Sequence, residues 1–416
     1  MADYFMIYSG ITLFLLFVFI LFIFTAIIIS SFKKQPKYKY EPNISILIPC
    51  YNEQKNIRKC LNAVYSSNYD KNKFEVIVID DGSVDNTGKI LKRYKKKNFS
   101  VIKSKHIGKA PALNLGVKKA KYGFIITLDA DTFVEKNAIK RLIAPFKNKN
   151  IGATNGSSVV RNSETILTDF QKIEYHSNNL IRKSFSDLFN TGIWFFGAFA
   201  AYRKTVLKKI NYFKTHTMTE DMDISLEIYS SGYKIQNVYN AIGSTFVQSS
   251  LDGFIKQRTR WWYGVLQSLK KHKKLFKIKS NPSILFLFIN QYWWTYYAIV
   301  SIPIIIYQYS FWLPYNLVDF FQFFMYTFRW FSLLGSIHVI YMIPVWGISF
   351  YSIFGVLSGI ISLFILSYAL ILFKEKFNLK TLFVLFFYFP YTILLNTIIV
   401  LSIIKGKLSK NKYFIS

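Results

Sequence analysis

The chain has 416 residues; 52% are hydrophobic and 19% aromatic, and 53 Lys and Arg residues against 22 Asp and Glu residues give a formal net charge of +31. This apolar composition excludes an intrinsically disordered chain, and the large net charge excludes an ordinary soluble metabolic enzyme. Because 45 of the basic residues lie within positions 31–280 and only 8 follow, the sequence predicts a basic, water-soluble domain between two apolar regions.

The first apolar region is an uncharged run of 29 residues at positions 4–32. It is long enough to cross a hydrocarbon layer of about 30 Å. A cleavable signal peptide would have a basic start and a shorter apolar stretch, so residues 1–33 are predicted to form a permanent transmembrane anchor. A lysine cluster follows (Lys33, Lys34, Lys37 and Lys39). By the positive-inside rule it places the next domain, residues 40–270, in the cytoplasm.

Short apolar runs alternate with helical stretches at the start of this domain. Strands are predicted at residues 44–48, 74–79, 100–103 and 123–128, with helices at 54–65, about 87–97 and about 110–120. Such alternation is typical of a Rossmann-like α/β domain with a mostly parallel sheet. Ligands bind beyond the carboxyl ends of such strands. Six polar residues follow the strands there: Asn52, Glu53, Asp80, Asp81, Asp129 and Asp131.

Asp129-Ala130-Asp131 directly follows the last of these strands. Two Asp residues at this spacing often only cap a turn or the next helix. Beside other acidic strand ends, however, they suit a hard cation, because carboxylates hold Mg²⁺ or Mn²⁺ while water and substrate phosphates fill the remaining positions. Asp80-Asp81-Gly82-Ser83 has the same two interpretations, as a helix cap after a turn or as a ligand site.

Three further groups combine basic, acidic and aromatic residues. Lys109 stands at a helix start, where a cation is unfavourable unless an anion such as a diphosphate binds; otherwise it is one solvated lysine among many. Thr219-Glu220-Asp221 begins a helix predicted over residues 222–229, where acidic caps are common. Gln257-Arg258-Thr259-Arg260-Trp261 precedes an apolar segment, where Arg and Trp often serve as membrane-interface anchors.

The second apolar region covers residues 281–404. Crossings are predicted near 283–307, 321–343, 348–373 and 381–404, which puts the basic tail, residues 405–416, in the cytoplasm. One conflict remains in this topology, because three lysines of one connecting loop would then lie outside: Lys374, Lys376 and Lys380. The stretch 311–334 has the alternative of lying flat as an interfacial helix.

Taken in order, the four motifs resemble one family. Asp80-Asp81-Gly82-Ser83, Asp129-Ala130-Asp131, Thr219-Glu220-Asp221 and Gln257-x-x-Arg260-Trp261 are similar to the signature of the inverting, processive membrane glycosyltransferases of family 2. These include the synthases of poly-N-acetylglucosamine, hyaluronan, chitin and cellulose, and the closest resemblance is to the first. It covers roughly residues 40–270 and the flanking spans. It implies an α/β GT-A fold, a UDP-sugar donor and Mg²⁺ or Mn²⁺.

The resemblance also implies residue roles. It assigns donor binding to six residues: Tyr51, Glu53, Asp80, Asp81, Lys109 and Asp129. Tyr51 would stack on the base, and Asp129 with Asp131 would meet the metal and the diphosphate. Catalysis falls to Asp221 as general base and to the adjacent Glu220. The acceptor and pyrophosphate region falls to three residues: Gln257, Arg260 and Trp261. Departures from the family pattern at residues 194–198 and 262–264 leave the transferred sugar open.

Three functions therefore remain open. The first is a plasma-membrane synthase that polymerises a UDP-sugar, N-acetylglucosamine or another hexose, and passes the polysaccharide through its own spans, with or without an accessory subunit. The second is transfer of a single sugar to a membrane lipid, because ceramide glucosyltransferases also carry Gln-x-x-Arg-Trp. The third is a membrane-tethered basic module that binds nucleic acid or anionic lipid without catalysis, favoured by the +26 charge of residues 31–280. It leaves the acidic motifs unexplained, and for the two enzyme functions nucleic acid is not an expected partner.

Overall fold

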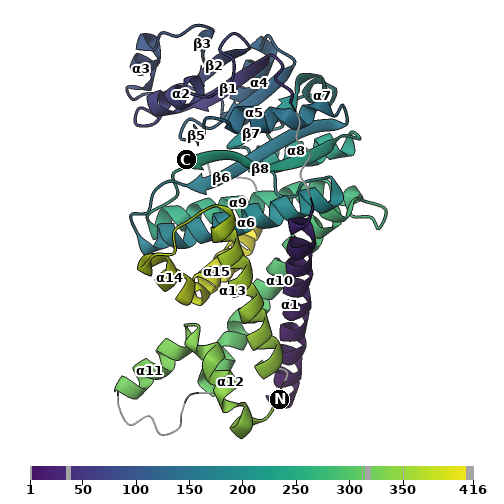
Figure 1. The fold of residues 1–416 in the computed structure, drawn as a ribbon, viewed down its shortest axis with the longest axis vertical. Helices are drawn as coiled ribbons and strands as arrows, with labels where there is room; N and C mark the ends of the chain where they lie inside the picture. Colours follow the sequence, from purple (N-terminus) through teal and green to yellow (C-terminus); the bar gives the residue numbers. More distant parts are fainter. Residues whose placement is uncertain (1, 34–38, 312, 314–319, 350, 409–416) are drawn as a thin grey trace.

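A computed structural model describes residues 2–33, 39–311, 313, 320–349 and 351–408. An α/β domain lies at one end of the molecule and a group of apolar helices at the other, as Figure 1 shows. Lys34 and Lys37 of the predicted lysine cluster, and residues 409–416 of the predicted basic tail, lie outside the described residues.

The α/β domain is built on an eight-stranded sheet in the order β3-β2-β1-β4-β7-β6-β8-β5. Its strands are β1 (Ile44–Cys50), β2 (Phe74–Asp80), β3 (Phe99–Lys103), β4 (Phe124–Leu128), β5 (Phe133–Val134), β6 (Ile151–Val160), β7 (Phe199–Arg203) and β8 (Lys234–Thr245). The first four pair in parallel, β7 runs antiparallel between β4 and β6, and β5 runs antiparallel to β8. The predicted Rossmann-like, mostly parallel sheet is thus confirmed.

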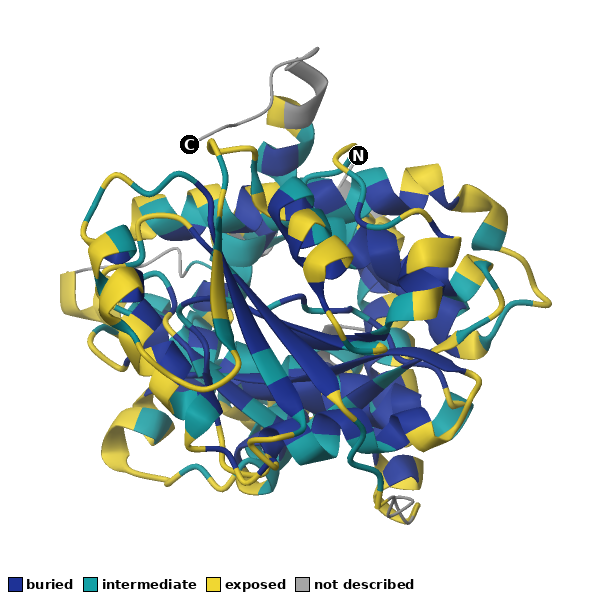
Figure 2. Ribbon diagram, turned by 90° about the horizontal axis from the view of Figure 1, so that it is seen from above, coloured by how far each residue is buried: buried dark blue, intermediate teal, exposed yellow. Residues whose placement is uncertain are grey.

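Helices cover both faces of this sheet, which explains why its strands read as continuous apolar runs. One face packs on α2 (Ile57–Tyr65) and α5 (Ala138–Ile143). The other packs on α4 (Lys109–Lys119), α7 (Lys204–Lys209) and α8 (Glu220–Ser230). Short helices complete the domain: α3 (Thr87–Arg93) and the 3₁₀ turns η1 (Ala144–Lys147) and η2 (Lys273–Leu275). Figure 2 shows the buried strands between helices whose outer faces are exposed.

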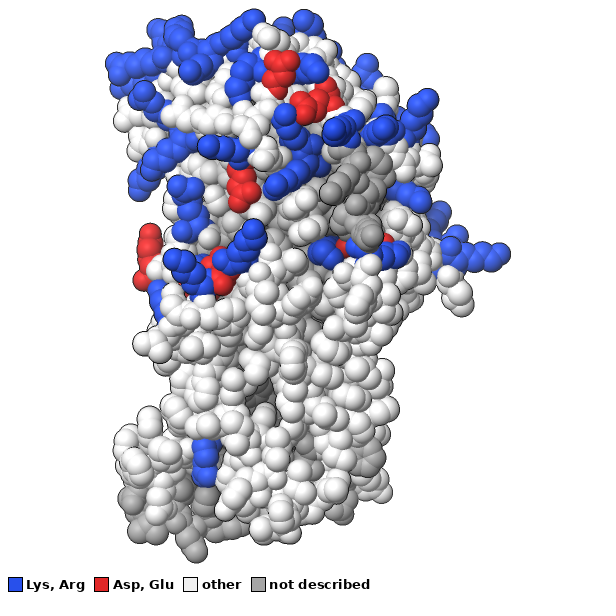
Figure 3. All heavy atoms as spheres, in the orientation of Figure 1, with Lys and Arg blue, Asp and Glu red and all other residues white. Residues whose placement is uncertain are grey.

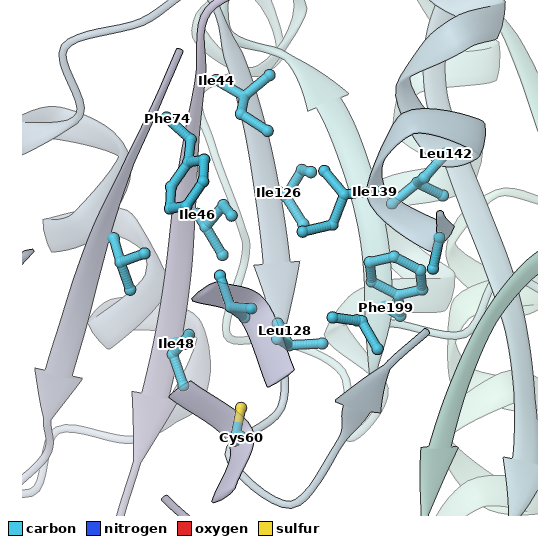
Figure 4. Packing of buried hydrophobic residues seen from close by; sticks show 14 of the residues in the cluster. Ile44, Ile46, Ile48, Cys60, Phe74, Ile126, Leu128, Ile139, Leu142 and Phe199 are labelled. Atoms are coloured by element: carbon cyan, nitrogen blue, oxygen red, sulfur yellow. The ribbon is translucent and has the colours of Figure 1, made fainter. Parts of the chain in front are cut away.

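Side-chain spacing decides which residues enter this core. Along β1, Ile46 and Ile48 point to the α2 face, whereas Leu47 packs on the α4 face, as the two-residue period of a strand requires. Helix α2 buries four side chains spaced at one helical face (Ile57, Cys60, Leu61 and Val64). Figure 4 shows Cys60 beside Ile48 and Leu128 in this core. The carboxyl ends of β1 and β4 are thereby held on rigid elements.

Two long amphipathic helices lie between the sheet and the apolar helices (Figure 1). They are α6 (Ile166–Phe189) and α9 (Leu251–Lys271). Thr165 begins α6 with a capping box, because its hydroxyl accepts from the backbone N–H of Thr168 and the Thr168 hydroxyl accepts from that of Thr165. Ser250 caps α9 in the simpler way, by accepting from the N–H of Gly253.

The apolar helices pack beneath α6 and α9. They are α1 (Ala2–Ser31), α10 (Pro282–Phe311), α11 (Phe320–Trp330), α12 (Leu334–Trp346), the π turn η3 (Tyr351–Gly355), α13 (Val356–Leu372), α14 (Leu379–Phe386) and α15 (Tyr388–Leu408). Figure 3 shows Lys and Arg side chains gathered on the α/β domain, while the visible surface of the apolar helices is almost free of charge. Charged side chains are costly inside a hydrocarbon layer, so this distribution is the one expected for helices that lie in a membrane.

The helices differ in detail from the five predicted crossings. Among the described residues, three helices are long and apolar enough to span a membrane (Ile7–Ser31, Ile353–Leu372 and Tyr388–Lys405), and the pair α11 and α12, bent by 100°, makes up to four. Helix α10 contains the stretch predicted as 283–307, but Asn290, Gln291 and several tyrosines make it less apolar. The stretch 381–404 is divided between α14 and α15.

The segment that follows α13, where the predicted topology had its conflict, contacts α6. Lys380 Nζ lies 2.7 Å from Asp169 Oδ2, and Glu375 Oε1 lies 3.0 Å from His176 Nε2. Asp169 and His176 both belong to α6. The loop therefore contacts the α/β domain and does not lie at the opposite end of the helices, where the predicted crossings would place it.

Candidate active site at the carboxyl edge of the sheet

The loops after β1 and β2 are joined to one another by hydrogen bonds. The Asp81 N–H donates to Cys50 O at 2.9 Å, and the Glu53 N–H donates to the Thr87 hydroxyl at 2.8 Å. Gly82 adopts φ +78°, and a Cβ there would come within 2.9 Å of the backbone nitrogen of His106, so the turn needs glycine. The predicted residues Glu53, Asp80 and Asp81 thus lie on one edge of the sheet.

Asp80 and Asp81 are buried and shape this edge. The Asp81 carboxylate accepts from the N–H groups of Ile107 and Gly108, both at 2.8 Å, and Asp80 accepts from the N–H of Ser83 at 3.1 Å. Asp81 therefore holds the loop that precedes α4. Direct contact of these carboxylates with a nucleoside stays a prediction.

Tyr51 lies at the open face of the same loop. Its ring stacks on the imidazole of His106, with 4.0 Å between ring centroids and 30° between planes, and Tyr51 is 43% exposed. The pair forms a flat aromatic surface of the kind on which a base stacks. Sequence reasoning assigned no role to His106, because no neighbouring residue signals that its ring meets Tyr51, which lies 55 positions earlier.

Lys109 joins two of the acidic motifs. Its Nζ lies 2.7 Å from Asp129 Oδ1 and 3.2 Å from Glu220 Oε1. Burial acts to lower the pKa of Lys109, but Asp129 and Glu220 outweigh it and raise that pKa. Acidic neighbours therefore offset the unfavourable charge at the start of α4. Lys109 is therefore ion-paired with two acidic motifs, and its contact with a diphosphate stays a prediction.

Asp131 lies in a cluster of carboxylates. Burial raises the pKa of Asp131 to about 6, and the negative charges of Asp129 and Glu53 add to this. Oxygen donors in an electrostatically crowded cluster suit a hard divalent cation, which would relieve the repulsion. Asp129 and Asp131 thus fit the predicted Mg²⁺ or Mn²⁺ in charge and donor type.

A second group of ligand-type side chains lies between α8 and α9. Ligand atoms of Asp223, Glu227 and His272 lie within 4.8 Å of one another. However, Lys271 Nζ already lies 2.9 Å from both oxygens of Asp223 and 3.0 Å from Glu227. Burial acts to raise the pKa of Asp223, but hydrogen bonds from His272 and Lys271 outweigh it and lower that pKa. We interpret this group as an ionic clamp between the two helices.

Asp221 stands in the first turn of α8. Its Oδ2 accepts from the N–H of Gly197 and its Oδ1 from that of Met222, both at 2.8 Å. Burial, with the adjacent charge of Glu220, raises the pKa of Asp221 to about 6. A carboxylate with a pKa slightly below neutral is largely ionised at pH 7 and is a stronger base than an ordinary Asp, which suits a general base.

Helix α9 fixes this segment relative to the last motif. A Cβ on Gly264 would lie 2.7 Å from Thr219 Cγ2, so only glycine allows this approach. The Met218 N–H donates to Gln267 Oε1 at 3.1 Å. Gln257 and Arg260 lie further towards the start of the same helix. The candidate base and the candidate acceptor residues are therefore held on one rigid support.

One cavity of about 1410 Å³ connects the acidic site with the apolar helices. Its lining includes the predicted site residues Lys109, Asp129, Asp131, Glu220, Asp221, Gln257, Arg260 and Trp261. Further along, aromatic residues from α10, α11 and the C-terminal helices line it: Trp294, Tyr297, Tyr307, Tyr326, Trp330, Phe386, Tyr388 and Phe389. Tyr51, Glu53, Asp80 and Asp81 do not line this cavity. The structure thus separates the predicted nucleoside residues from those predicted to meet diphosphate and acceptor.

Sequence reasoning missed a buried ion pair beside this cavity. Arg258 Nη1 lies 2.9 Å from Glu174 Oε1, and Arg258 Nη2 donates to Glu174 Oε2 at 3.0 Å. Tyr391 of α15 also donates to Glu174. The guanidinium carbon of Arg258 lies 4.7 Å from the centre of the Trp261 ring. Helices α6, α9 and α15 therefore meet at Glu174, and only the position of Arg258 within the last motif could have hinted at this.

Removing one member of this pair should destabilise the protein strongly. We expect Arg258→Met to cost about 3–5 kcal/mol, because it leaves the Glu174 carboxylate buried with little compensation, whereas Glu174→Met with Arg258→Met together should cost much less. Melting temperatures in detergent test this difference. Lys256→Met breaks an exposed ion pair on the same helix and should leave the melting temperature unchanged. Equal losses for the single and double variants would contradict the expectation.

Comparisons with known proteins agree with these features. Residues 45–211 match the family described as Glycosyl transferase family 2. The poly-beta-1,6-N-acetyl-D-glucosamine synthase of Staphylococcus aureus (strain COL) is 34% identical over 275 residues, which cover 65% of this chain and 66% of that protein. The synthase of the same name from Staphylococcus epidermidis is 36% identical over 224 residues, or 53% of this chain and 54% of that protein. The chain thus matches just under two thirds of the length of the first of these relatives.

The fold itself also has a solved counterpart. The mannosyltransferase PcManGT from Pyrobaculum calidifontis, solved in complex with GDP-Man and Mn²⁺, superposes with a TM-score of 0.65 at 17% sequence identity, over 97% of this chain and 99% of that one. At this identity the likeness concerns the fold alone. Together these comparisons confirm the predicted GT-A fold and the resemblance on which it was based.

Proposed function

We propose that this chain transfers a sugar from a UDP-sugar to a growing polysaccharide, because residues 45–211 match the family described as Glycosyl transferase family 2. The observation that carries the proposal is the single cavity that joins Lys109, Asp129 and Asp221 to the apolar helices. A polymer made at the acidic end has a continuous path from there towards the membrane. N-acetylglucosamine is the sugar that the names of the matched synthases favour.

The donor would bind across the carboxyl ends of β1, β2 and β4. Its base would rest on the aromatic surface of Tyr51 and His106, near Glu53 and the loop that Asp81 holds. Its diphosphate would reach Lys109, which would then exchange part of its contact with Asp129 and Glu220 for phosphate oxygens. A divalent cation bound by Asp129 and Asp131 would neutralise charge on the departing diphosphate.

Asp221 would act on the acceptor side. Its raised pKa and its position in the cavity suit removal of a proton from the acceptor hydroxyl as that oxygen attacks the anomeric carbon. The nucleoside diphosphate leaves as an anion and needs no protonation, so one base is sufficient. A single displacement of this kind inverts the anomeric configuration. Gln257, Arg260 and Trp261 would hold the acceptor and the pyrophosphate.

The aromatic lining of the cavity supports polymer transfer through the apolar helices. Sugar rings present flat CH faces to aromatic side chains, and Trp261, Trp294 and Trp330 are among the aromatic residues that line the cavity. The apolar helices would lie in the plasma membrane, with the basic α/β domain on the cytoplasmic side, as the positive-inside rule requires. In this arrangement synthesis and translocation share one channel.

The test is an incubation of membranes containing the full chain with UDP-N-acetylglucosamine and other UDP-sugars, with Mg²⁺ or Mn²⁺. We expect release of UDP together with a ladder of long saccharides. UDP release with a single glycolipid and no longer products would favour the lipid-transfer alternative. Absence of UDP release with every donor, from chain shown to be folded, would contradict glycosyl transfer and favour a binding module. Membranes with Asp252→Asn, an exposed acidic residue on α9, serve as the matched active control.

A further inference from the structure

Arg182 of α6 is a buried cation for which the proposed chemistry has no use. It is 1% exposed and ranks among the largest fully buried side chains. Its Nη1 donates to Asn179 Oδ1 at 2.9 Å and its Nη2 to Gly156 O at 3.1 Å, while Nε has no partner. Within the described residues, no carboxylate lies within 4.0 Å of it. An unpaired buried arginine is costly and calls for an explanation.

The guanidinium lies directly beneath the segment that contacts the candidate base. Its carbon is 4.2 Å from the centre of the Phe196 ring, a cation–π contact that burial strengthens. The next residue, Gly197, donates its N–H to Asp221 Oδ2 at 2.8 Å, and a Cβ on Gly197 would lie only 2.8 Å from Asp221 Cβ. Any shift of Phe196 is therefore transmitted to Asp221.

The same segment also reaches the candidate metal ligands. The Asp129 N–H donates to Ala198 O at 3.0 Å, and the Thr127 hydroxyl donates to Gly197 O at 3.3 Å. Residues 196–198 thus bridge the loop after β4 and the start of α8. Arg182, fixed by its bonds to β6 and to its own helix, supports this bridge from the protein interior.

The charge of Arg182 is also relevant to Asp221. Burial lowers the pKa of Arg182 to about 9, and the negative charge of Asp221 is the one influence that opposes this shift. The charge of Glu220 on α8 raises the pKa of Asp221 and that of Lys109 on α4 lowers it. The Asp221 charge in turn raises the pKa values of Arg182 on α6 and Tyr202 on β7. Of these, Lys109 is already paired with Asp129 and Glu220, whereas Arg182 has no carboxylate partner of its own.

We propose that Arg182 is a positioning residue for Asp221: it holds Phe196 and Gly197 against this carboxylate and supplies a buried positive charge that keeps it ionised. The inference rests on the proposed function, because it assigns Asp221 the role of base. It adds a residue of the interior to the reaction, one that touches neither donor nor acceptor.

Three variants of the full chain in membranes separate the two parts of the proposal. Arg182→Met removes the charge and keeps an unbranched chain; we expect kcat to fall by up to about 10²-fold through misplacement of the base. The acid limb of the pH–kcat profile should move up by about one pH unit, because loss of a nearby cation raises the pKa of a carboxyl. Arg182→Lys should keep the wild-type limb with a reduced kcat. Phe196→Leu should likewise reduce kcat without moving the limb.

The matched control is Arg203→Met. Arg203 also stacks on phenylalanine rings, Phe124 and Phe146, and donates to backbone carbonyls, but it does not contact the acidic site. We expect this variant to lower the melting temperature and to leave the pH–kcat profile in place. KM for the UDP-sugar should stay within about twofold of the wild type in all four variants, since none of these side chains is assigned to the donor.

The outcomes are distinct. The proposal would be overturned if Arg182→Met kept both the wild-type kcat and the wild-type acid limb of the pH–kcat profile. It would also be overturned if Arg203→Met shifted that acid limb by the same amount as Arg182→Met. If Arg182→Met does not fold, the test relies on Arg182→Lys and Phe196→Leu. A shift of the acid limb of the pH–kcat profile in either variant overturns the charge argument. A wild-type chain that is folded and releases no UDP from any UDP-sugar defeats the proposed function instead, before the variants are compared.

Discussion

Replacing Asp221 with Asn should reduce sugar transfer by about 10²–10⁴-fold, the usual contribution of a general base. The amide cannot take the proton of the acceptor hydroxyl, yet it has almost the size and shape of the carboxyl group. Binding of the UDP-sugar should persist, because the residues assigned to the donor lie on the loops after β1, β2 and β4 and, for Lys109, at the start of α4. Radiolabelled sugar incorporation, compared with donor binding at equilibrium, measures the two effects separately.

The stability of this variant provides a check against a trivial loss of folding. The pKa of Asp221 is raised to about 6 in the folded chain, from an ordinary value of 3.8. Between these values the unfolded chain has lost the proton that the folded chain still holds, so stability falls as pH rises through this window. At pH 7 the ionised carboxyl therefore destabilises the fold. Asp221→Asn should melt at the wild-type temperature or higher.

The pH dependence of transfer follows from the same shift. Because the base must be ionised, the wild-type rate should rise with pH, reach half of its maximum near the Asp221 pKa of about 6, and level off above that pH. Asp221→Asn should show a low rate without this rise. Asp252→Asn removes an exposed carboxyl from the first turn of α9 and should keep the wild-type profile. A residual rate in Asp221→Asn that still rises through pH 6 would show that another group is the base.

The sequence was informative where function depends on the ends of buried strands. Runs such as residues 44–48 and 74–79 are apolar throughout because both faces of the sheet are covered, so their ends mark the ligand edge without knowledge of the fold. Asp129 and Asp131 come from one motif and Asp221 from another, 90 positions later, and the structure places all three along one cavity. Lys109 lies beside Asp129 and belongs to the same group of charged residues. The residue types of the motifs and their order along the chain had indicated this group.

Side-chain pairing over long sequence distances was not accessible in this way. Glu174 meets Arg258 and Tyr391, which lie 84 and 217 positions away, and no local pattern couples α6 to α15. Arg182 looked like one more basic residue in a basic domain, because burial of a charge depends on the tertiary packing alone. Asp81 was assigned to a ligand, but its hydrogen bonds to the loop before α4 depend on where that loop returns.

The helices of the apolar region differ from the predicted crossings for a physical reason. Uncharged stretches indicate burial in hydrocarbon, yet they do not distinguish a straight span from a bent one. Helices α11 and α12 turn by 100°, and α14 is a separate short helix that Asn378 caps. The ion pair of Lys380 with Asp169 then holds the preceding loop on the side of the α/β domain. Loop charge alone could not reveal a partner on α6.

Chelation of divalent cations should stop sugar transfer, with a loss of about 10²-fold or more, and Mn²⁺ or Mg²⁺ should restore it. Asp131 is half-buried, and this desolvation, together with the negative charges of Asp129 and Glu53, raises its pKa. A bound divalent cation would supply the missing positive charge. Asp131→Asn should need about tenfold more metal, or greater, for half-maximal transfer, because one ligand of the cation is lost. UDP release as a function of free Mn²⁺ measures both effects.

The second ligand-type cluster supplies the control for this experiment. Lys271→Met removes the ammonium group from between Asp223 and Glu227 and should lower the melting temperature without altering the metal concentration that transfer requires. A changed metal requirement in this variant would place a functional cation at the α8–α9 clamp instead.

Full transfer in the presence of chelator would mean that Lys109 and Arg260 neutralise the departing diphosphate without a metal. In that case Lys109→Met should reduce transfer more than Asp131→Asn does, because the Lys109 ammonium group would supply charge that a divalent cation otherwise provides. This variant also leaves Asp129 and Glu220 without their ion-pair partner.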